Sequence, residues 1–129
     1  MSNENADNLQ VICLCADWCS TCRDYRGGFD ALAENLPAAR FHWLDIEEQG
    51  DELGDLDVEN FPTILIVRGT NVLFYGTLLP HLSHLRRLIE TLAEQTAEQS
   101  RAYARSTSER RAWQEDGDLG NLRRLHADA

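Results

Sequence analysis

The four cysteines of this 129-residue chain lie within ten positions, and none follows them: Cys13, Cys15, Cys19 and Cys22. A disulfide framework that stabilises a small secreted fold spreads its cysteines along the chain. The clustering therefore excludes that class and indicates redox or metal chemistry. The fold must be held together by an ordinary apolar core, and 43% hydrophobic against 26% charged residues suits a single globular domain.

The charge of the chain excludes further classes of function. A formal net charge of −10 argues against nucleic acid or an anionic membrane surface as a partner. No apolar run reaches the roughly 18 residues that a membrane-spanning helix needs. The polar, acidic lead of residues 1–8 predicts a cytoplasmic protein. Residues 45–59 hold eight acids and no base, a pattern typical of a solvated face or, alternatively, of a surface that steers a basic partner.

The first part of the chain has the pattern of a strand, a helix and a second strand. Residues 9–15 form a short, almost wholly apolar run, typical of a strand covered on both faces. A helical stripe follows and ends at Pro37, with the Gly27-Gly28 pair as an expected bend. Residues 40–45 predict the second strand. Such a unit implies a right-handed crossover between two parallel strands.

The middle of the chain has the pattern of an antiparallel hairpin. Residues 61–67 are the strongest strand signal, and a turn leads from them into a partner strand at residues 72–76. A short helix is expected near residues 49–56. These elements together predict an α/β sandwich with a mixed central sheet.

The last part of the chain is predicted to be helical. Ser83 is a candidate N-cap for a helix with one apolar face. That face has four members: Leu85, Leu88, Ile89 and Leu92. From residue 95 the composition favours helix until Gly117 and Gly120. The organisation expected is a domain at residues 9–94 and a helical tail at 95–129, the tail being docked on the domain, a partner-binding arm, or frayed.

Cys19 and Cys22 form a C-x-x-C motif where the first strand gives way to the helix. The first turn of a helix has free N–H groups and the positive end of the dipole, both of which stabilise a thiolate at Cys19. A thiolate is the attacking species in disulfide exchange. Cys22 follows one turn later, near enough to close an intramolecular disulfide. In a strand–helix–strand unit this motif indicates thiol–disulfide redox chemistry.

These residues resemble the thioredoxin family. Residues 16–23, Ala-Asp-Trp-Cys-Ser-Thr-Cys-Arg, are similar to its active-site stretch. Further on, Phe61-Pro62-Thr63 is similar to its second signature, a proline that is cis in the fold and faces the cysteines. The resemblance covers roughly residues 9–93 and implies the family's three-layer sandwich with a helical extension at the C-terminal end.

The resemblance also implies roles for individual residues. Cys19 would be the nucleophile and Cys22 the resolving thiol of a redox-active disulfide, with no cofactor and no metal. Four residues would form the substrate groove: Trp18, Phe61, Pro62 and Gly76. The main chain of Phe61 would pair with an extended segment of the substrate.

The function that the resemblance implies is that of a cytoplasmic thiol–disulfide oxidoreductase. It would reduce protein disulfides through a mixed disulfide on Cys19 that Cys22 resolves. Its partners would be disulfide-containing client proteins and an upstream reductase, without nucleic acid or membrane. The alternative is a thioredoxin-like interaction module whose tail recruits one dedicated client and which has little general reductase activity.

Three departures from the family's pattern bear on these expectations. Ser20-Thr21 replaces the usual Gly-Pro between the two cysteines. The family's buried acid falls on Cys13, so deprotonation of Cys22 would be slower or would use Asp17 or water. Only eight residues precede the first strand, too few for the N-terminal strand and helix that full thioredoxins have.

Cys13 and Cys15 are open to three interpretations. They are two apart on a predicted strand and therefore share one face. They could be small buried hydrophobic residues, as free cysteines usually are. They could be auxiliary thiols that relay oxidation from Cys22. A zinc site made of all four sulfurs is the third interpretation, although the spacing is not that of a zinc ribbon or finger.

Overall fold

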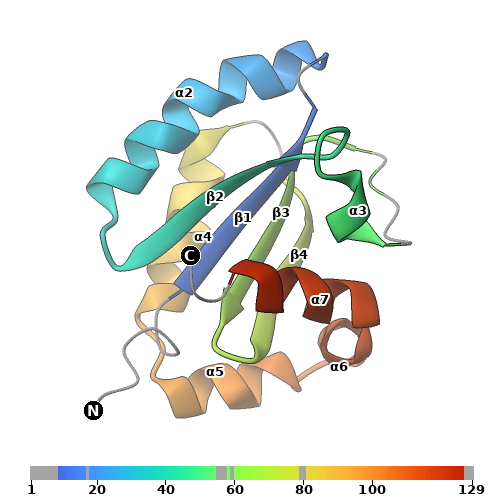
Figure 1. Cartoon of the computed structure of the whole chain (residues 1–129). Coiled ribbons are helices and arrows are strands. Elements are labelled where there is room, and N and C mark those ends of the chain that lie inside the picture. Colours follow the sequence, from blue (N-terminus) through green and yellow to red (C-terminus); the bar gives the residue numbers. More distant parts are fainter. Residues whose placement is uncertain (1–8, 17, 55–57, 59, 79–80, 127–129) are drawn as a thin grey trace.

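A four-stranded mixed sheet forms the centre of the molecule. The computed structural model describes residues 9–16, 18–54, 58, 60–78 and 81–126. The strands are β1 (Leu9–Cys15), β2 (Ala39–Asp45), β3 (Thr63–Arg68) and β4 (Asn71–Thr77), in the spatial order β2-β1-β3-β4 (Figure 1). β1 is parallel to β2 and antiparallel to β3, and β4 is antiparallel to β3. The predicted parallel crossover, hairpin and mixed sheet are confirmed.

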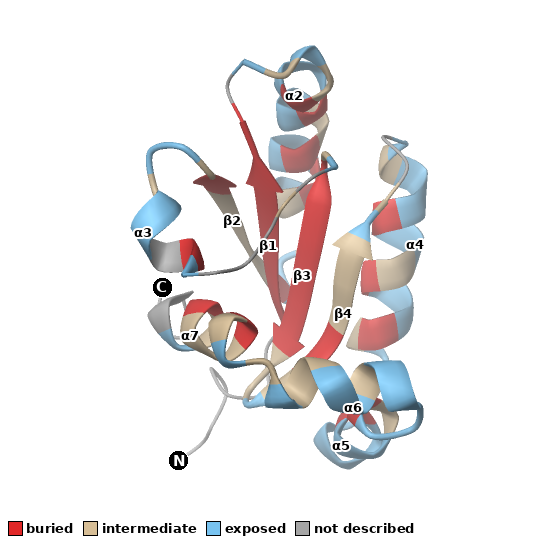
Figure 2. Ribbon diagram, turned by 90° about the vertical axis from the view of Figure 1, so that its right-hand side faces the viewer, coloured by how far each residue is buried: buried red, intermediate tan, exposed pale blue. Residues whose placement is uncertain are grey.

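Helices cover both faces of this sheet and give the expected three layers. α2 (Ser20–Asn35) and α4 (Leu82–Ala93) lie on one face, and α3 (Gly50–Leu53) and α7 (Gly117–His126) lie on the other (Figure 2). α5 (Ala97–Ala104) and α6 (Ser108–Glu115) contact β4. None of the helices that the structure describes is long and apolar enough to cross a membrane.

The side chains of β1 alternate between two separate apolar cores, and all seven residues of the strand are buried. The core under α2 and α4, which we call the α2-side core, takes Leu9, Val11, Cys13 and Cys15. The core under α3 and α7, the α7-side core, takes Ile12 and Leu14. Successive side chains of a strand point to opposite faces, so a strand between two helical layers is apolar at nearly every position. Gln10 is the buried polar exception in β1, and its Oε1 lies 2.6 Å from His42 Nε2.

Two expectations about α2 and α4 are wrong. The bend predicted at Gly27-Gly28 is absent, because α2 is one continuous helix from Ser20 to Asn35. A Cβ on Gly28 would overlap the side chain of Leu82, so this glycine permits a close approach of α4 to α2. Ser83 is not the N-cap of α4, since the helix begins at Leu82, two residues before the start that a Ser83 cap implies, and His81 occupies the cap position.

The tail is three short helices docked on the domain, not one long helix. The side chains of Thr96 and Thr107 cap α5 and α6. The Asp116 carboxylate accepts hydrogen bonds from two backbone N–H groups in the first turn of α7. Gly117 and Gly120 therefore lie within a third helix and do not end the helical segment as predicted. A new helix therefore begins after each of the three polar capping residues, Thr96, Thr107 and Asp116.

Helices of the tail cover the α7-side core. Leu119 and Leu122 of α7 are 1% and 0% exposed and pack in this core with Leu53 of α3. Trp113 of α6 packs against the same cluster and lies edge-on to Phe74. Removing the tail would uncover the apolar residues of the sheet that α7 and Trp113 cover.

The side chain of Gln114 binds the edge strand β4 as a neighbouring strand would. The Val72 N–H donates to Gln114 Oε1 at 2.8 Å, and Gln114 Nε2 donates to the Val72 carbonyl at 2.7 Å. The same amide also donates to the Ala104 carbonyl at 3.2 Å, which links β4 to α5 and α6. An edge strand has unpaired backbone groups, and this residue satisfies two of them.

Replacing Gln114 by alanine is expected to lower the free energy of unfolding by about 1–3 kcal/mol, because it leaves the buried Val72 backbone groups unpaired. Urea denaturation measures the change. Glu115→Ala, at the exposed neighbouring position, is the matched control and should stay within about 0.5 kcal/mol of the parent chain. Equal stability of the two variants would contradict the role assigned to Gln114.

Candidate active site

The C-x-x-C motif lies where β1 ends and α2 begins, as predicted. Cys19 is the N-cap residue of α2, with extended backbone angles φ −89° and ψ 119°. The Cys19 carbonyl accepts the first helical hydrogen bond from the Arg23 N–H at 3.1 Å. The Cys19 thiol is free and half-buried, and Cys22 lies on the buried face of the first turn. Free N–H groups of this first turn are thus close to Cys19.

Trp18 and Phe61 form one apolar rim beside Cys19. The Trp18 ring is 61% exposed and packs edge-on against Phe61, with ring centroids 5.6 Å apart. The Trp18 Nε1–H donates to Glu47 Oε2 at 3.0 Å, which fixes the orientation of the indole. Glu47 has no distinguishing signal in the sequence, where it is one acid among eight, so sequence reasoning missed it.

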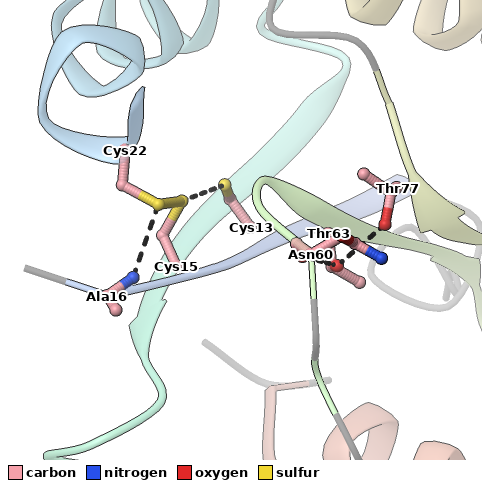
Figure 3. The surroundings of a disulfide bond; sticks show 7 residues. All are labelled: Cys13, Cys15, Ala16, Cys22, Asn60, Thr63 and Thr77. Carbon is pink, nitrogen blue, oxygen red and sulfur yellow. Dashed lines mark hydrogen bonds between the residues drawn. A yellow bond between two sulfur atoms is a disulfide. The ribbon is translucent and has the colours of Figure 1, made fainter. Parts of the chain in front are cut away.

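The loop that leads into β3 brings Pro62 to the same end of the sheet. The Phe61–Pro62 peptide bond is cis, as the resemblance implies. The Thr63 hydroxyl donates to the Asn60 carbonyl at 2.5 Å and lies 3.4 Å from the Thr77 hydroxyl (Figure 3). The Pro62 carbonyl accepts a hydrogen bond from the Leu78 N–H at 3.3 Å. These bonds anchor the proline to β4 and to its own loop.

Gly76 lies on β4 and pairs with Ile64 of β3. Ile64 is two residues beyond Pro62 in the sequence. A Cβ added at Gly76 would meet the Phe74 ring at 3.5 Å, an ordinary van der Waals distance. The packing of this chain therefore does not require glycine here. The predicted groove role of Gly76 stays a prediction.

The disulfide in this structure joins Cys22 to Cys15, so the predicted Cys19–Cys22 pairing is not the one observed. Cys15 is the last residue of β1 and belongs to the α2-side core, and its side chain points toward Cys22 (Figure 3). Cys22 points into the same core from α2, and the two Cα atoms are 5.8 Å apart, within the range that a disulfide spans. Cys19, at the cap, lies only partly against this core.

Two groups donate hydrogen bonds to the sulfurs of the disulfide. The Ala16 N–H donates to Cys22 Sγ at 3.4 Å, and the Cys13 S–H donates to Cys15 Sγ at 3.9 Å. Cys13 and Cys15 are 0% exposed and Cys22 is 1% exposed. Solvent reductants therefore have no direct route to these sulfurs in the native fold.

Burial raises the pKa of the Cys13 thiol far above its ordinary value, and the charge of Arg26 offsets only part of that effect. Cys13 is therefore a protonated donor at neutral pH and not a proton acceptor. The interpretation of Cys13 as a buried apolar residue agrees with its surroundings, whereas the same interpretation of Cys15 is wrong.

Tyr25, which the helical stripe of the sequence places on the buried face, is a second buried polar group near the cysteines. It lies one turn after Cys22 on the buried face of α2. Its hydroxyl has no hydrogen-bond partner among the residues that the structure describes. Burial raises the pKa of Tyr25, and the proximity of Cys13 raises it further. Its spacing of three residues from Cys22 is the signal that marks it as facing the same core.

The described residues provide no group of three or more His, Cys, Asp or Glu side chains that could hold a metal ion. The proposed zinc site of four sulfurs is not formed, since Cys15 and Cys22 are bonded to each other. Asp17, the predicted auxiliary acid, lies outside the described residues, so its role stays a prediction.

Comparisons with known proteins agree on one family. The family model described as Thioredoxin matches residues 2–91. Thioredoxin-1 of Saccharomyces cerevisiae is 32% identical over 62 residues, which are 48% of this chain and 60% of that protein. Thioredoxin-2 of the same yeast is 29% identical over 65 residues, 50% of this chain and 62% of that protein. The chain thus spans less than two thirds of the length of these curated relatives.

Solved structures show the same fold. The X-ray structure of Fasciola hepatica thioredoxin matches with a TM-score of 0.62 and 25% identity, over 69% of this chain and 85% of that one. Thioredoxin f from spinach chloroplast, in its long form, matches with a TM-score of 0.61 and 23% identity, over 70% of this chain and 74% of that one.

Proposed function

Because the chain belongs to the thioredoxin family, we propose that it is a thiol–disulfide oxidoreductase that reduces disulfides of client proteins. The observation that carries the proposal is the position of Cys19 at the N-cap of α2, free and partly exposed beside the Trp18–Phe61 rim. Three features favour thiol–disulfide exchange as the chemistry of this site. They are the family of redox-active disulfide proteins, the position of Cys19 at a helix start, and the exposed apolar rim beside it.

The first step proposed is attack of the Cys19 thiolate on one sulfur of a client disulfide. The client S–S bond breaks, the distal client sulfur leaves as a thiolate, and a mixed disulfide forms between Cys19 and the client. The free N–H groups and dipole of the first helical turn stabilise the attacking thiolate. The exposed indole of Trp18, oriented by Glu47, gives the client an apolar surface beside the reacting sulfur.

The second step proposed is attack of Cys22, as a thiolate, on the Cys19 sulfur. The client's second sulfur leaves, and a Cys19–Cys22 disulfide forms. The client disulfide has then gained two electrons and two protons, which the two cysteines have lost. The Ala16 N–H, 3.4 Å from Cys22 Sγ, is placed to stabilise the attacking sulfur.

The partners proposed follow from the same cycle. A client with an extended segment would pair with the main chain of Phe61, next to cis-Pro62. An upstream reductase would return the oxidised protein to the dithiol. The cytoplasmic location stays a prediction.

The experiment that tests this function is trapping with Cys22→Ser. Without the resolving thiol, the reduced variant mixed with insulin should accumulate a covalent complex that reducing agent dissolves. The double variant Cys19→Ser, Cys22→Ser is the control and should form none. Equal trapping by the double variant would contradict the assignment of Cys19. Absence of any insulin complex from the single variant would favour the interaction module with a dedicated client.

A further inference from the structure

The structure holds Cys22 in a disulfide with a residue outside the C-x-x-C motif and leaves Cys19 as a free thiol. We propose that Cys15 is a third redox-active cysteine of this site. Turnover produces a Cys19–Cys22 disulfide, and Cys15 then replaces Cys19 as the partner of Cys22. The oxidised protein at rest therefore contains a Cys15–Cys22 disulfide. This inference rests on the proposed function, which supplies the Cys19–Cys22 disulfide.

Cys22 is within reach of both partners. Its bond to Cys15 is present in the structure, with the two Cα atoms 5.8 Å apart. Cys19 is the N-cap and Cys22 the third helical residue, and this is the C-x-x-C spacing of disulfides that exchange at a helix start. A change of the Cys22 rotamer would then redirect its sulfur from one cysteine to the other.

The exchange balances without an outside oxidant. The Cys15 thiolate attacks Cys22 Sγ, the bond between Cys15 and Cys22 forms, and the bond between Cys22 and Cys19 breaks. Cys19 leaves as a thiolate and takes up the proton that Cys15 gave up. The protein holds one disulfide before and after the step, so its oxidation state is unchanged.

Burial favours the exchanged state. When Cys22 is bonded to Cys15, the thiol left over is Cys19, which is partly exposed at the start of α2. When Cys22 is bonded to Cys19, the thiol left over is Cys15, which is 0% exposed and lies beside the buried Cys13. An ionisable thiol is better accommodated at the surface, and a disulfide without charge is better accommodated in the core.

The exchanged state has a chemical consequence for the enzyme. Its disulfide is buried, so a reductant reaches it only after Cys19 attacks Cys22 and brings the disulfide back to the surface. Until then Cys19 can form a mixed disulfide with a client, but Cys22 is not free to resolve it. Cys15 would thus hold the oxidised protein in a form with a buried disulfide, and only attack by Cys19 would return that disulfide to the C-x-x-C motif.

The sequence permits a direct map of the disulfide. Cleavage on the N-terminal side of aspartate separates residues 7–16, which hold Cys13 and Cys15, from residues 17–23, which hold Cys19 and Cys22. The protein is reduced, oxidised by insulin, quenched in acid to stop exchange, alkylated in denaturant and cleaved. Mass spectrometry then identifies the linked peptides. The proposal predicts a cross-link between the two peptides, with Cys19 alkylated.

Two results of this map separate the role of Cys15 from the proposed reductase function. The first would overturn the role of Cys15, and the second would support it. An internal disulfide within residues 17–23, with insulin reduced, overturns the role of Cys15 while the proposed function stands. Cross-linked peptides after oxidation by a small disulfide, in a protein that does not reduce insulin, support the pairing and count against the proposed function. Cys13→Ala is the matched control, and its cross-link should be unchanged.

The second measurement separates a redox role from a merely structural disulfide. In Cys19→Ser the Cys15–Cys22 disulfide is closed by oxidation during refolding, when both sulfurs are accessible. Its reduction by dithiothreitol should then be at least roughly tenfold slower than in the parent chain, because the relay through Cys19 is lost. Serine is a favoured N-cap residue, so this variant should retain the fold. Equal reduction rates in the two proteins would overturn the proposal.

Discussion

Replacing Cys19 by serine is expected to lower the rate of insulin reduction by roughly two orders of magnitude or more, to the level of the uncatalysed reaction with dithiothreitol. The hydroxyl of serine cannot form the mixed disulfide through which every turnover passes. The precipitation of the insulin B chain, followed by turbidity, measures the rate. Circular dichroism should show an unchanged fold, because serine suits the N-cap position that Cys19 occupies.

Cys13→Ala is the matched control for this experiment. It also removes one of the four cysteines, but from a site that is 0% exposed and holds a thiol that stays protonated. Its rate should stay within a small factor of that of the parent chain. Equal losses of activity in Cys13→Ala and Cys19→Ser would contradict Cys19 as the nucleophile.

Replacing Leu122 by alanine is expected to lower the free energy of unfolding by about 2–5 kcal/mol. Leu122 is 0% exposed and packs with Leu119 and Leu53 in the α7-side core. Truncation removes buried methyl groups and leaves a cavity that the two short helices α3 and α7 close only in part. Chemical denaturation with a two-state fit measures the change.

Arg124→Ala is the control on the same helix, where the arginine is exposed. It should change the stability by less than about 0.5 kcal/mol. If Leu122→Ala and Arg124→Ala were equally stable, the tail would not be docked on the sheet as the structure has it.

The strands were predictable because their signals are local. The almost wholly apolar run of Leu9–Cys15 requires cover on both faces, and the structure provides it with two helical layers. The hairpin of β3 and β4 follows from a β-branched run, an apolar and aromatic run, and a turn between them. The tail was harder, because alanine, glutamate and arginine favour helix everywhere, and only the caps at Thr96, Thr107 and Asp116 divide it.

The partner of Cys22 was not predictable from spacing. The C-x-x-C motif is a local signal and indicates Cys19, whereas the bond to Cys15 depends on how closely the first turn of α2 packs on the end of β1. That distance is a property of tertiary packing and is not encoded in a seven-residue separation. The bond between Trp18 and Glu47 is non-local in the same way, since 29 residues separate them.

The most direct test of the proposed chemistry is a count of thiols over a single turnover. The fully reduced chain has four thiols. Mixed with an excess of insulin and no other reductant, it should lose two thiols for each insulin disulfide that is opened. A chain that keeps all four thiols while insulin stays oxidised would contradict the proposal that this protein reduces disulfides.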